Sequence, residues 1–332
     1  MKRNYFILVT AALLFGCASC GNSNKSAMNQ TEETTVVKAP DFDADSAYNY
    51  VQEQVDFGPR VPNTKQHVAC GEYLAKKLAS TGAKVIDQYA DLTAYDGTIL
   101  KSRNIIGSFN PETKKRVLLF AHWDTRPWAD QDKDESKHHT PILGANDGAS
   151  GIGVLLEIAR QLGKKAPSIG VDIIFFDAED YGTPEFYKGE HKEESWCLGT
   201  QYWANNPHVE GYNARFGILL DMVGGKGATF YKEAYSSEFA KSTVKKVWDK
   251  ANSMGYASYF INQDGGYVTD DHLFVNRIAK IPSIDIIPTD LSTPEGGFGY
   301  FWHTTDDNMS NIDRSTLKAV GQTVLEVVYN EK

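Results

Sequence analysis

Four short apolar runs, separated by longer segments with helical periodicity, limit the fold of this chain more than any other feature. Each run is rich in Val, Ile, Leu and Phe, which is typical of a strand buried on both faces. The runs are residues 116–121, 171–176, 216–220 and 281–287. Strands that alternate with helices indicate an α/β fold with a mostly parallel central sheet and helices on both faces.

Helical periodicity is found before the strands, between them and at the end of the chain. The predicted helices are residues 46–55, 66–80, 148–162, 236–254 and 313–329. Residues 98–109 are expected to add an antiparallel edge strand before the first central strand. No repeat or second linker divides this pattern, so we predict a single domain over residues 43–332, which carries every candidate catalytic residue.

The first 42 residues differ in composition from the rest. Lys2 and Arg3 precede an apolar run that is too short to span a bilayer, as in an export signal. Residues 1–20 are predicted to be a lipoprotein signal peptide, with Cys20 favoured over Cys17 as the lipid-carrying residue. Residues 21–42 are polar and predict a flexible tether. We therefore expect an exported, periplasmic protein that is attached to a membrane by lipid; an ordinary cleaved signal is the alternative.

The net charge and the remaining cysteines exclude several classes of function. A formal charge of −9 repels phosphate backbones and anionic lipid, which argues against nucleic-acid binding and against membrane contact other than through a lipid anchor. Cys70 and Cys197 are the cysteines outside the N-terminal segment. A buried free thiol is expected at Cys70, although pairing with Cys197 is left open. Two lone cysteines do not make a thiolate zinc site, so a metal here requires His, Asp and Glu.

Residues that bind metals occur where the predicted strands end and where the next helix begins. They are His122, Asp147, Glu179, Asp180, Asp221 and His303. Ligands of open α/β sheets bind at the carboxyl ends of the strands, so these side chains are expected to converge. Imidazole together with carboxylate suits zinc, which takes three protein ligands in catalytic sites, better than it suits magnesium.

Each of these residues also has a purely structural interpretation. Asp147 is a possible helix cap and Asp221 a possible turn former. Glu179 and Asp180 are possible solvated loop charges, and His303 alone is more often structural than a ligand. Their joint placement at the ends of four strands favours the metal site over these separate explanations.

Five local sequences resemble, in order along the chain, glutaminyl-peptide cyclotransferase of the animal type, an enzyme whose fold is shared with zinc aminopeptidases. They are FAHWD (120–124), GANDGASG (144–151), FFDAED (175–180), LD (220–221) and WHTTDDN (302–308). The resemblance implies a zinc aminopeptidase-like fold and one zinc ion, with the ligands Asp147, Asp180 and His303. It implies that Glu179 is the general acid/base, with Asp221 and Asp270 in a hydrogen-bond chain behind it.

The resemblance also implies an aromatic pocket for the substrate. Trp302 and Phe298 are expected to line this glutamine pocket, and Trp196 to add a further wall. Three features depart from the family pattern, one of which is Thr269 at a position where glutamine is common. Asp180 stands where a glutamate is usual, so the ligand is one methylene shorter, and the loop over residues 181–195 does not align.

The implied reaction converts N-terminal glutamine of peptides and proteins to pyroglutamate and releases ammonia. The main alternative is a two-zinc aminopeptidase of the same fold, because the five positions needed for two ions are also present: His122, Asp147, Asp180, Asp221 and His303. A second alternative is a non-catalytic, zinc-stabilised peptide-binding lipoprotein, which would not require Glu179.

Overall fold

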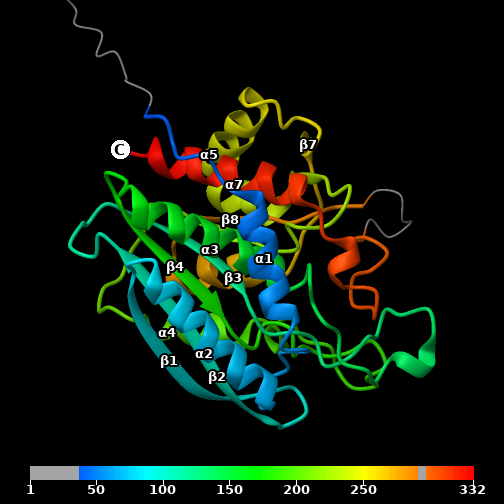
Figure 1. Cartoon of the computed structure of the whole chain (residues 1–332). Coiled ribbons are helices and arrows are strands. Elements are labelled where there is room, and N and C mark those ends of the chain that lie inside the picture. Colours follow the sequence, from blue (N-terminus) through cyan, green and yellow to red (C-terminus); the bar gives the residue numbers. More distant parts are fainter. Residues whose placement is uncertain (1–36, 291–296) are drawn as a thin grey trace, which may run out of the picture. The chain divides into compact units, whose positions relative to one another are not determined.

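The computed structural model describes residues 37–290 and 297–332. A six-stranded sheet forms the centre of this part of the chain (Figure 1). Its strands are β1 (Lys84–Thr93), β2 (Ile99–Phe109), β3 (Arg116–His122), β4 (Gly170–Phe176), β5 (Gly217–Leu220) and β8 (Ser283–Ile286). The longer helices are α1 (Ala44–Val55), α2 (Lys65–Ser80), α3 (Ala149–Lys164), α4 (Leu198–Asn205), α5 (Ala234–Ser253) and α7 (Arg314–Tyr329). The four predicted central strands and five predicted helices are therefore present, with boundaries that differ by a few residues.

The strand order β1-β2-β4-β3-β5-β8 confirms a mostly parallel sheet. β4, β3, β5 and β8 are parallel, whereas β2 runs antiparallel to both of its neighbours, β1 and β4. The antiparallel strand over residues 98–109 was predicted correctly, but its edge position was wrong. The edge is β1, whose side chains are exposed or half-buried throughout, so that it lacks the apolar run that marks the central strands.

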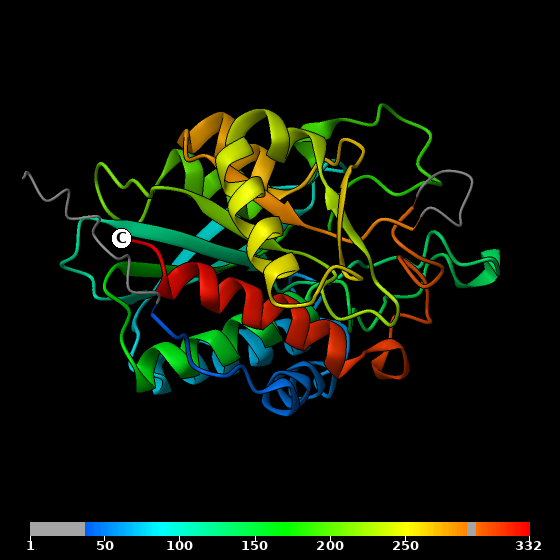
Figure 2. The same cartoon turned by 90° about the horizontal axis from the view of Figure 1, so that it is seen from above.

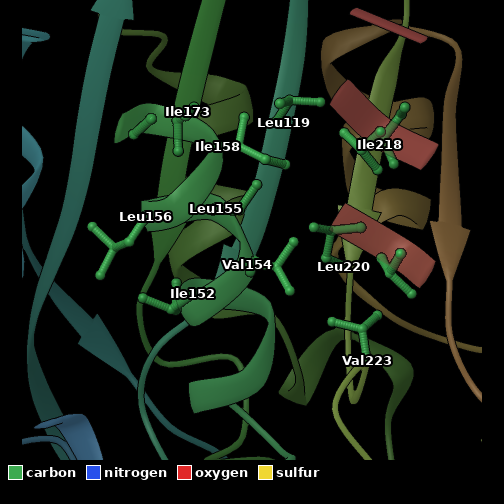
Figure 3. Packing of buried hydrophobic residues seen from close by; sticks show 14 of the residues in the cluster. Leu119, Ile152, Val154, Leu155, Leu156, Ile158, Ile173, Ile218, Leu220 and Val223 are labelled. Atoms are coloured by element: carbon green, nitrogen blue, oxygen red, sulfur yellow. The ribbon is translucent and has the colours of Figure 1, made fainter. Parts of the chain in front are cut away.

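Successive apolar side chains of a strand point to opposite faces of the sheet, and the two faces belong to different hydrophobic clusters. In β3, Leu119 belongs to the larger cluster and Leu118 to the smaller one, as the two-residue period of a strand requires. Helices α2, α3 and α7 contribute to the larger cluster, and α4 contributes Trp203 to the smaller one. Figure 2 shows these layers from above, and Figure 3 shows α3 side chains packed against β3, β4 and β5.

Smaller elements surround this core. A parallel pair, β6 (Phe230–Lys232) and β7 (Phe260–Asp264), packs beside α5. The short helix α6 (Asp271–Phe274) contacts both α4 and β8. None of these three elements was predicted, because none contains a continuous apolar run like those of the central strands.

Helix α3 begins closer to β5 than a side chain at its first turn would allow. An ideal Cβ at Gly151 would lie 2.1 Å from the carbonyl oxygen of Leu220. Glycine therefore permits a close approach of helix to strand. This approach brings the segment before α3, which holds Asp147, next to the ends of β3 and β5.

The predicted tether ends earlier than residue 42. Ala39 and Phe42 are buried, and the Phe42 amide donates to the Gln322 side chain of α7 at 2.8 Å. Apolar side chains within the polar stretch thus anchor its end to the domain. The predicted signal peptide and residues 21–36 of the tether lie outside the described residues. Within the described part of the chain, every helix is too short or too polar to cross a bilayer.

Candidate active site and metal centre

A pocket of about 160 Å³ opens at the carboxyl ends of the parallel strands. All nine residues predicted to act in catalysis, substrate binding or metal binding line it: Asp147, Glu179, Asp180, Trp196, Asp221, Asp270, Phe298, Trp302 and His303. The convergence follows from the topology, because parallel strands end on the same side of a sheet.

Asp147, Asp180 and His303 form a buried group that we call the metal trio. One ligand atom of each lies within 4.8 Å of the others. The His303 Nε2 atom is 3.4 Å from Asp147 Oδ2 and 3.3 Å from Asp180 Oδ1. Three segments far apart in sequence thus present one imidazole nitrogen and two carboxylates to a common point.

His122, Asp147 and Asp221 form a second buried group, which we call the neighbouring trio. The His122 Nε2 atom lies 3.0 Å from Asp147 Oδ1 and 3.1 Å from Asp221 Oδ1, and the latter contact is a hydrogen bond. Asp147 therefore belongs to both trios, with one carboxylate oxygen directed to each imidazole. Asp221, which was expected to stand behind Glu179, is hydrogen-bonded to His122.

Asp147 does not cap helix α3, so its structural interpretation was wrong. The N-cap residue is Gly148, with φ +96°, and no side chain caps the helix. The Asp147 side chain is instead directed to the two histidines. Its backbone is fixed by Asp307, whose two carboxylate oxygens accept the amides of Asn146 at 2.7 Å and Asp147 at 3.0 Å.

The segment that carries Glu179 and Asp180 is fixed in a similar way. The Asp124 carboxylate accepts the Glu179 amide at 3.1 Å and the Asp180 amide at 3.2 Å. Arg126 donates to the Asp180 carbonyl oxygen at 3.1 Å, and the Asp130 carboxylate holds its guanidinium through two contacts. Two members of the metal trio thus have their backbone held by a buried carboxylate: Asp147 by Asp307, and Asp180 by Asp124.

Glu179 lies beside a second acid, as the resemblance implied. Ligand atoms of Glu179 and Asp270 lie within 4.8 Å of each other. Burial raises the pKa of Glu179 well above its ordinary value, and the charges of Asp180 and Asp270 raise it further against the opposing effect of His122. Burial and the nearby Asp221 likewise raise the pKa of Asp270. Carboxyls this close cannot all ionise independently, so the group is suited to holding and moving a proton.

Aromatic rings form the wall of the pocket. The Trp302 and His303 rings are stacked with centroids 3.9 Å apart, and Phe298 meets Trp302 edge-on at 4.9 Å. The Trp196 ring lies 6.2 Å from the His303 ring and nearly parallel to it, with Arg126 above its face at 4.7 Å. Trp196 therefore reaches the pocket although its loop does not align with the family.

The metal trio fits a zinc ion. Asp180 Oδ2 is buried and has no hydrogen-bond partner among residues 37–290 and 297–332, which leaves a carboxylate oxygen available to a cation. Two carboxylates and one imidazole are a usual three-ligand set for catalytic zinc. Asp130 Oδ1 lies 3.6 Å from Nδ1 of His303, on the side of the ring away from the trio. This separation is longer than a hydrogen bond, and Asp130 Oδ1 accepts from Arg126 Nε instead.

Four supporting residues were not assigned roles from the sequence: Asp124, Arg126, Asp130 and Asp307. Asp124 and Asp307 lie inside two of the matching strings, two residues after His122 and four after His303. Their presence in those strings was a usable signal. Arg126 and Asp130 carried no such signal, because a charged loop residue is normally solvated, whereas these two are almost completely buried. Cys70 and Cys197 are both buried free thiols, as expected for Cys70.

Comparison with known proteins places the chain among related enzymes. A glutaminyl cyclase of Bacteroides thetaiotaomicron, solved with N-acetylhistamine bound, is 69% identical, with a TM-score of 0.87 over 89% of this chain and 100% of that one. Tannerella forsythia glutaminyl cyclase is 60% identical, with a TM-score of 0.86 over 88% and 100%. Glutaminyl-peptide cyclotransferase of Drosophila melanogaster is 26% identical over 78% of this chain and 73% of its own length.

The match to a family model covers most of the domain. Residues 104–328 match the model of peptidase family M28, and this range contains both trios and every residue of the pocket. The fold, the ordered motifs and the family match all indicate the same family. The chain belongs to peptidase family M28.

Proposed function

We propose that this protein is a zinc-dependent glutaminyl-peptide cyclotransferase, which converts N-terminal glutamine of peptides and proteins to pyroglutamate and releases ammonia. The observation that carries the proposal is the placement of Glu179 beside the metal trio, in a pocket lined by Trp196, Phe298 and Trp302. Identities of 69% and 60% to two bacterial glutaminyl cyclases support it.

Cyclisation requires one proton to leave the attacking nitrogen and one to reach the departing nitrogen. The substrate α-amine forms a bond to its own side-chain amide carbon, and the bond from that carbon to the amide nitrogen breaks. Glu179 would accept the proton from the α-amine and return it to the leaving ammonia. Asp270, next to Glu179, would share the proton between these steps. When bound, a zinc ion supplies a Lewis acid that polarises the amide carbonyl and offsets the negative charge on its oxygen.

The aromatic wall would make the pocket selective for a folded-back glutamine side chain. Trp302 and Phe298 provide two ring surfaces at 70° to each other, which favours a compact substrate over an extended one. Water is not a reactant in cyclisation, and excluding it strengthens each electrostatic contact in the pocket. The nucleophile is part of the substrate, so the protein's own contribution is orientation, proton transfer and charge stabilisation.

We further propose that a single zinc ion is bound, by Asp147, Asp180 and His303. In the neighbouring trio the Nε2 atom of His122, which faces the two carboxylates, is already hydrogen-bonded to Asp221, whereas the metal trio contains an oxygen of Asp180 without a partner in the described chain. The Asp180 side chain is one methylene shorter than the usual glutamate. It would still reach the ion, because Asp124 and Arg126 hold its backbone in place.

A two-zinc aminopeptidase is the second candidate, and the neighbouring trio favours it. His122 and Asp221 stand next to Asp147 and would complete a second metal position. In that case Glu179 would activate water, and the protein would release the first residue of a peptide.

One experiment separates the two candidates. The purified domain is incubated with Gln-Ala and Leu-Ala dipeptides, and ammonia and free amino acids are measured separately. Ammonia from Gln-Ala without free glutamine, lost with a heterocyclic chelator and restored by zinc, is the expected result. Release of leucine without ammonia would assign the protein to the peptidases.

We also propose that the protein is exported and lipid-anchored in the periplasm through Cys20, with Cys17 as the alternative. The supporting features are the basic start, the short apolar run and the small residues before these cysteines. Labelled palmitate should enter the full-length chain and the Cys17→Ala variant, but not the Cys20→Ala variant. Equal labelling of the wild type and Cys20→Ala would contradict this assignment.

A further inference from the structure

The two buried cysteines lie in opposite surroundings. Cys70 belongs to the large apolar cluster under the sheet, where a free thiol behaves as a small hydrophobic group. Cys197 is equally buried, yet it is in none of the three apolar clusters formed by the described residues. Its sulfur is instead within 4.8 Å of carboxylate oxygens of Glu179 and Asp270. Apolar packing therefore accounts for Cys70 but not for Cys197.

The Cys197 thiol makes a direct contact with the acid/base residue. Its Sγ lies 3.4 Å from Glu179 Oε1 and donates a hydrogen bond to it. The other oxygen, Oε2, faces the His122 ring at 3.9 Å from Nδ1. Burial raises the pKa of the Cys197 thiol well above its ordinary value, and the charges of Asp271 and Glu179 raise it further. The thiol consequently keeps its proton and remains a donor.

Backbone bonds hold this thiol at a fixed place relative to Glu179. The amides of Cys197, Leu198 and Gly199 donate to the carbonyls of Glu179, Ala178 and Asp177, at 3.0 to 3.1 Å. Cys197 has a left-handed backbone, φ +55° and ψ +35°, which is uncommon for a residue other than glycine. Such conformations persist where the surroundings enforce them, and they are concentrated at functional sites. The start of α4 is thus joined to the segment that carries the acid/base.

We propose that Cys197 is a positioning residue for Glu179, whose thiol holds the carboxyl group in the orientation that proton transfer requires. This inference rests on the proposed cyclase function. The Glu179 backbone is fixed by Asp124 and by the Cys197 amide, but these contacts leave its side-chain torsions free. The thiol contact restricts those torsions at the carboxyl group itself. A small error in the placement of a reacting group lowers the rate strongly. Loss of this contact should therefore lower kcat and leave KM nearly unchanged.

The test compares Cys197→Ala with the matched variant Cys70→Ala. In Cys197→Ala, kcat on Gln-Ala should fall about tenfold, while KM and bound zinc stay within twofold of wild type. Cys197→Ser, which retains a hydroxyl donor, should recover part of kcat. Cys70→Ala should lower the melting temperature, because it leaves a cavity in the apolar core, and should keep the wild-type kcat.

Three outcomes decide between the positioning role and its alternatives. Wild-type kcat in Cys197→Ala would overturn the positioning role. A parallel fall of kcat and zinc content in that variant would also overturn it, because the residue would then be only structural. The wild-type protein is assayed first, since a failure to release ammonia from Gln-Ala overturns the proposed function itself and not only the role of the thiol.

Discussion

The two trios that share Asp147 contain similar groups but differ in how their imidazole is bonded. In the neighbouring trio, His122 Nε2 is hydrogen-bonded to Asp221 at 3.1 Å, and the ring also faces Asp124 and Glu179. In the metal trio, His303 Nε2 stays 3.3 to 3.4 Å from its carboxylates, and Asp180 keeps an oxygen without a partner in the described chain. Both trios have the ligand types and spacing of a metal site, and they differ in the hydrogen bond that His122 Nε2 forms with Asp221.

Replacing the shared residue should have the largest effect, because it breaks both trios at once. In Asp147→Ala we expect bound zinc to fall below one tenth of the wild-type content and ammonia release to fall about 10⁴-fold, as when a metal and its charge stabilisation are removed together. Metal analysis and the Gln-Ala assay measure the two quantities. Asp264→Ala, a change at an exposed acid, is the control. Full zinc content in Asp147→Ala would show that the trio is not the metal site.

Glu179→Gln should separate metal binding from chemistry. The amide keeps the size of the side chain but cannot take a proton, so kcat should fall by about 10² to 10⁴ while zinc content stays at the wild-type level. Single-turnover kinetics with Gln-Ala and zinc analysis of the same sample provide the measurement. Retention of most activity would show that Glu179 is not the acid/base of the reaction.

Asp307→Asn tests the backbone support of the shared residue. Its carboxylate accepts the amides of Asn146 and Asp147, and an amide side chain replaces one of these acceptors with a donor. We expect zinc affinity to fall about 10- to 100-fold, since groups that orient ligands contribute that much. Competition with a fluorescent zinc chelator measures it. The neighbouring Asp306→Asn is the control, and an equal loss in both variants would contradict this specific role.

His122→Gln should have the smallest effect on metal content and gives the sharpest comparison of the trios. With a single ion, bound zinc should remain at one per chain, while kcat should fall about tenfold because a charge-assisted hydrogen bond beside Glu179 is lost. Metal content of the wild type and variant should therefore be equal. A drop from two ions to one on substitution would instead establish the dinuclear peptidase site.

The sequence was sufficient to predict the parts of this molecule that repeat a strong local pattern. The four central strands have apolar runs, and their carboxyl ends meet at one edge of the sheet, so Asp147, Glu179, Asp180, Asp221 and His303 could be selected as candidates before the structure. The other four pocket residues, Trp196, Asp270, Phe298 and Trp302, were predicted from the family resemblance. Strand β1 could not be predicted, because its side chains never form such an apolar run. The order in which strands pair is also a tertiary property, which is why the edge was assigned to the wrong strand.

The bonding within the site was less predictable than its residues. Asp221 was predicted to belong to the acids behind Glu179, and its hydrogen bond to His122 is a further contact that no sequence pattern indicated. Arg126 and Asp130 occur in a loop whose composition indicates solvent exposure, yet their mutual ion pair allows both to be buried. The two residues are only four positions apart, but that spacing predicts an ion pair on a helix and not in a loop.

The contact between the beginning and the end of the domain has a practical consequence. Val37 and Asn330 are joined by two hydrogen bonds, from the Val37 amide to the Asn330 side chain and from that side chain to the Val37 carbonyl. The last residues also bind Arg215, at the amino end of β5, which is the edge of the sheet away from the pocket. A fusion partner or a surface linkage attached at Lys332, or directly at Val37, therefore leaves the pocket unobstructed, and a circularly permuted domain needs only a short connector between these two ends.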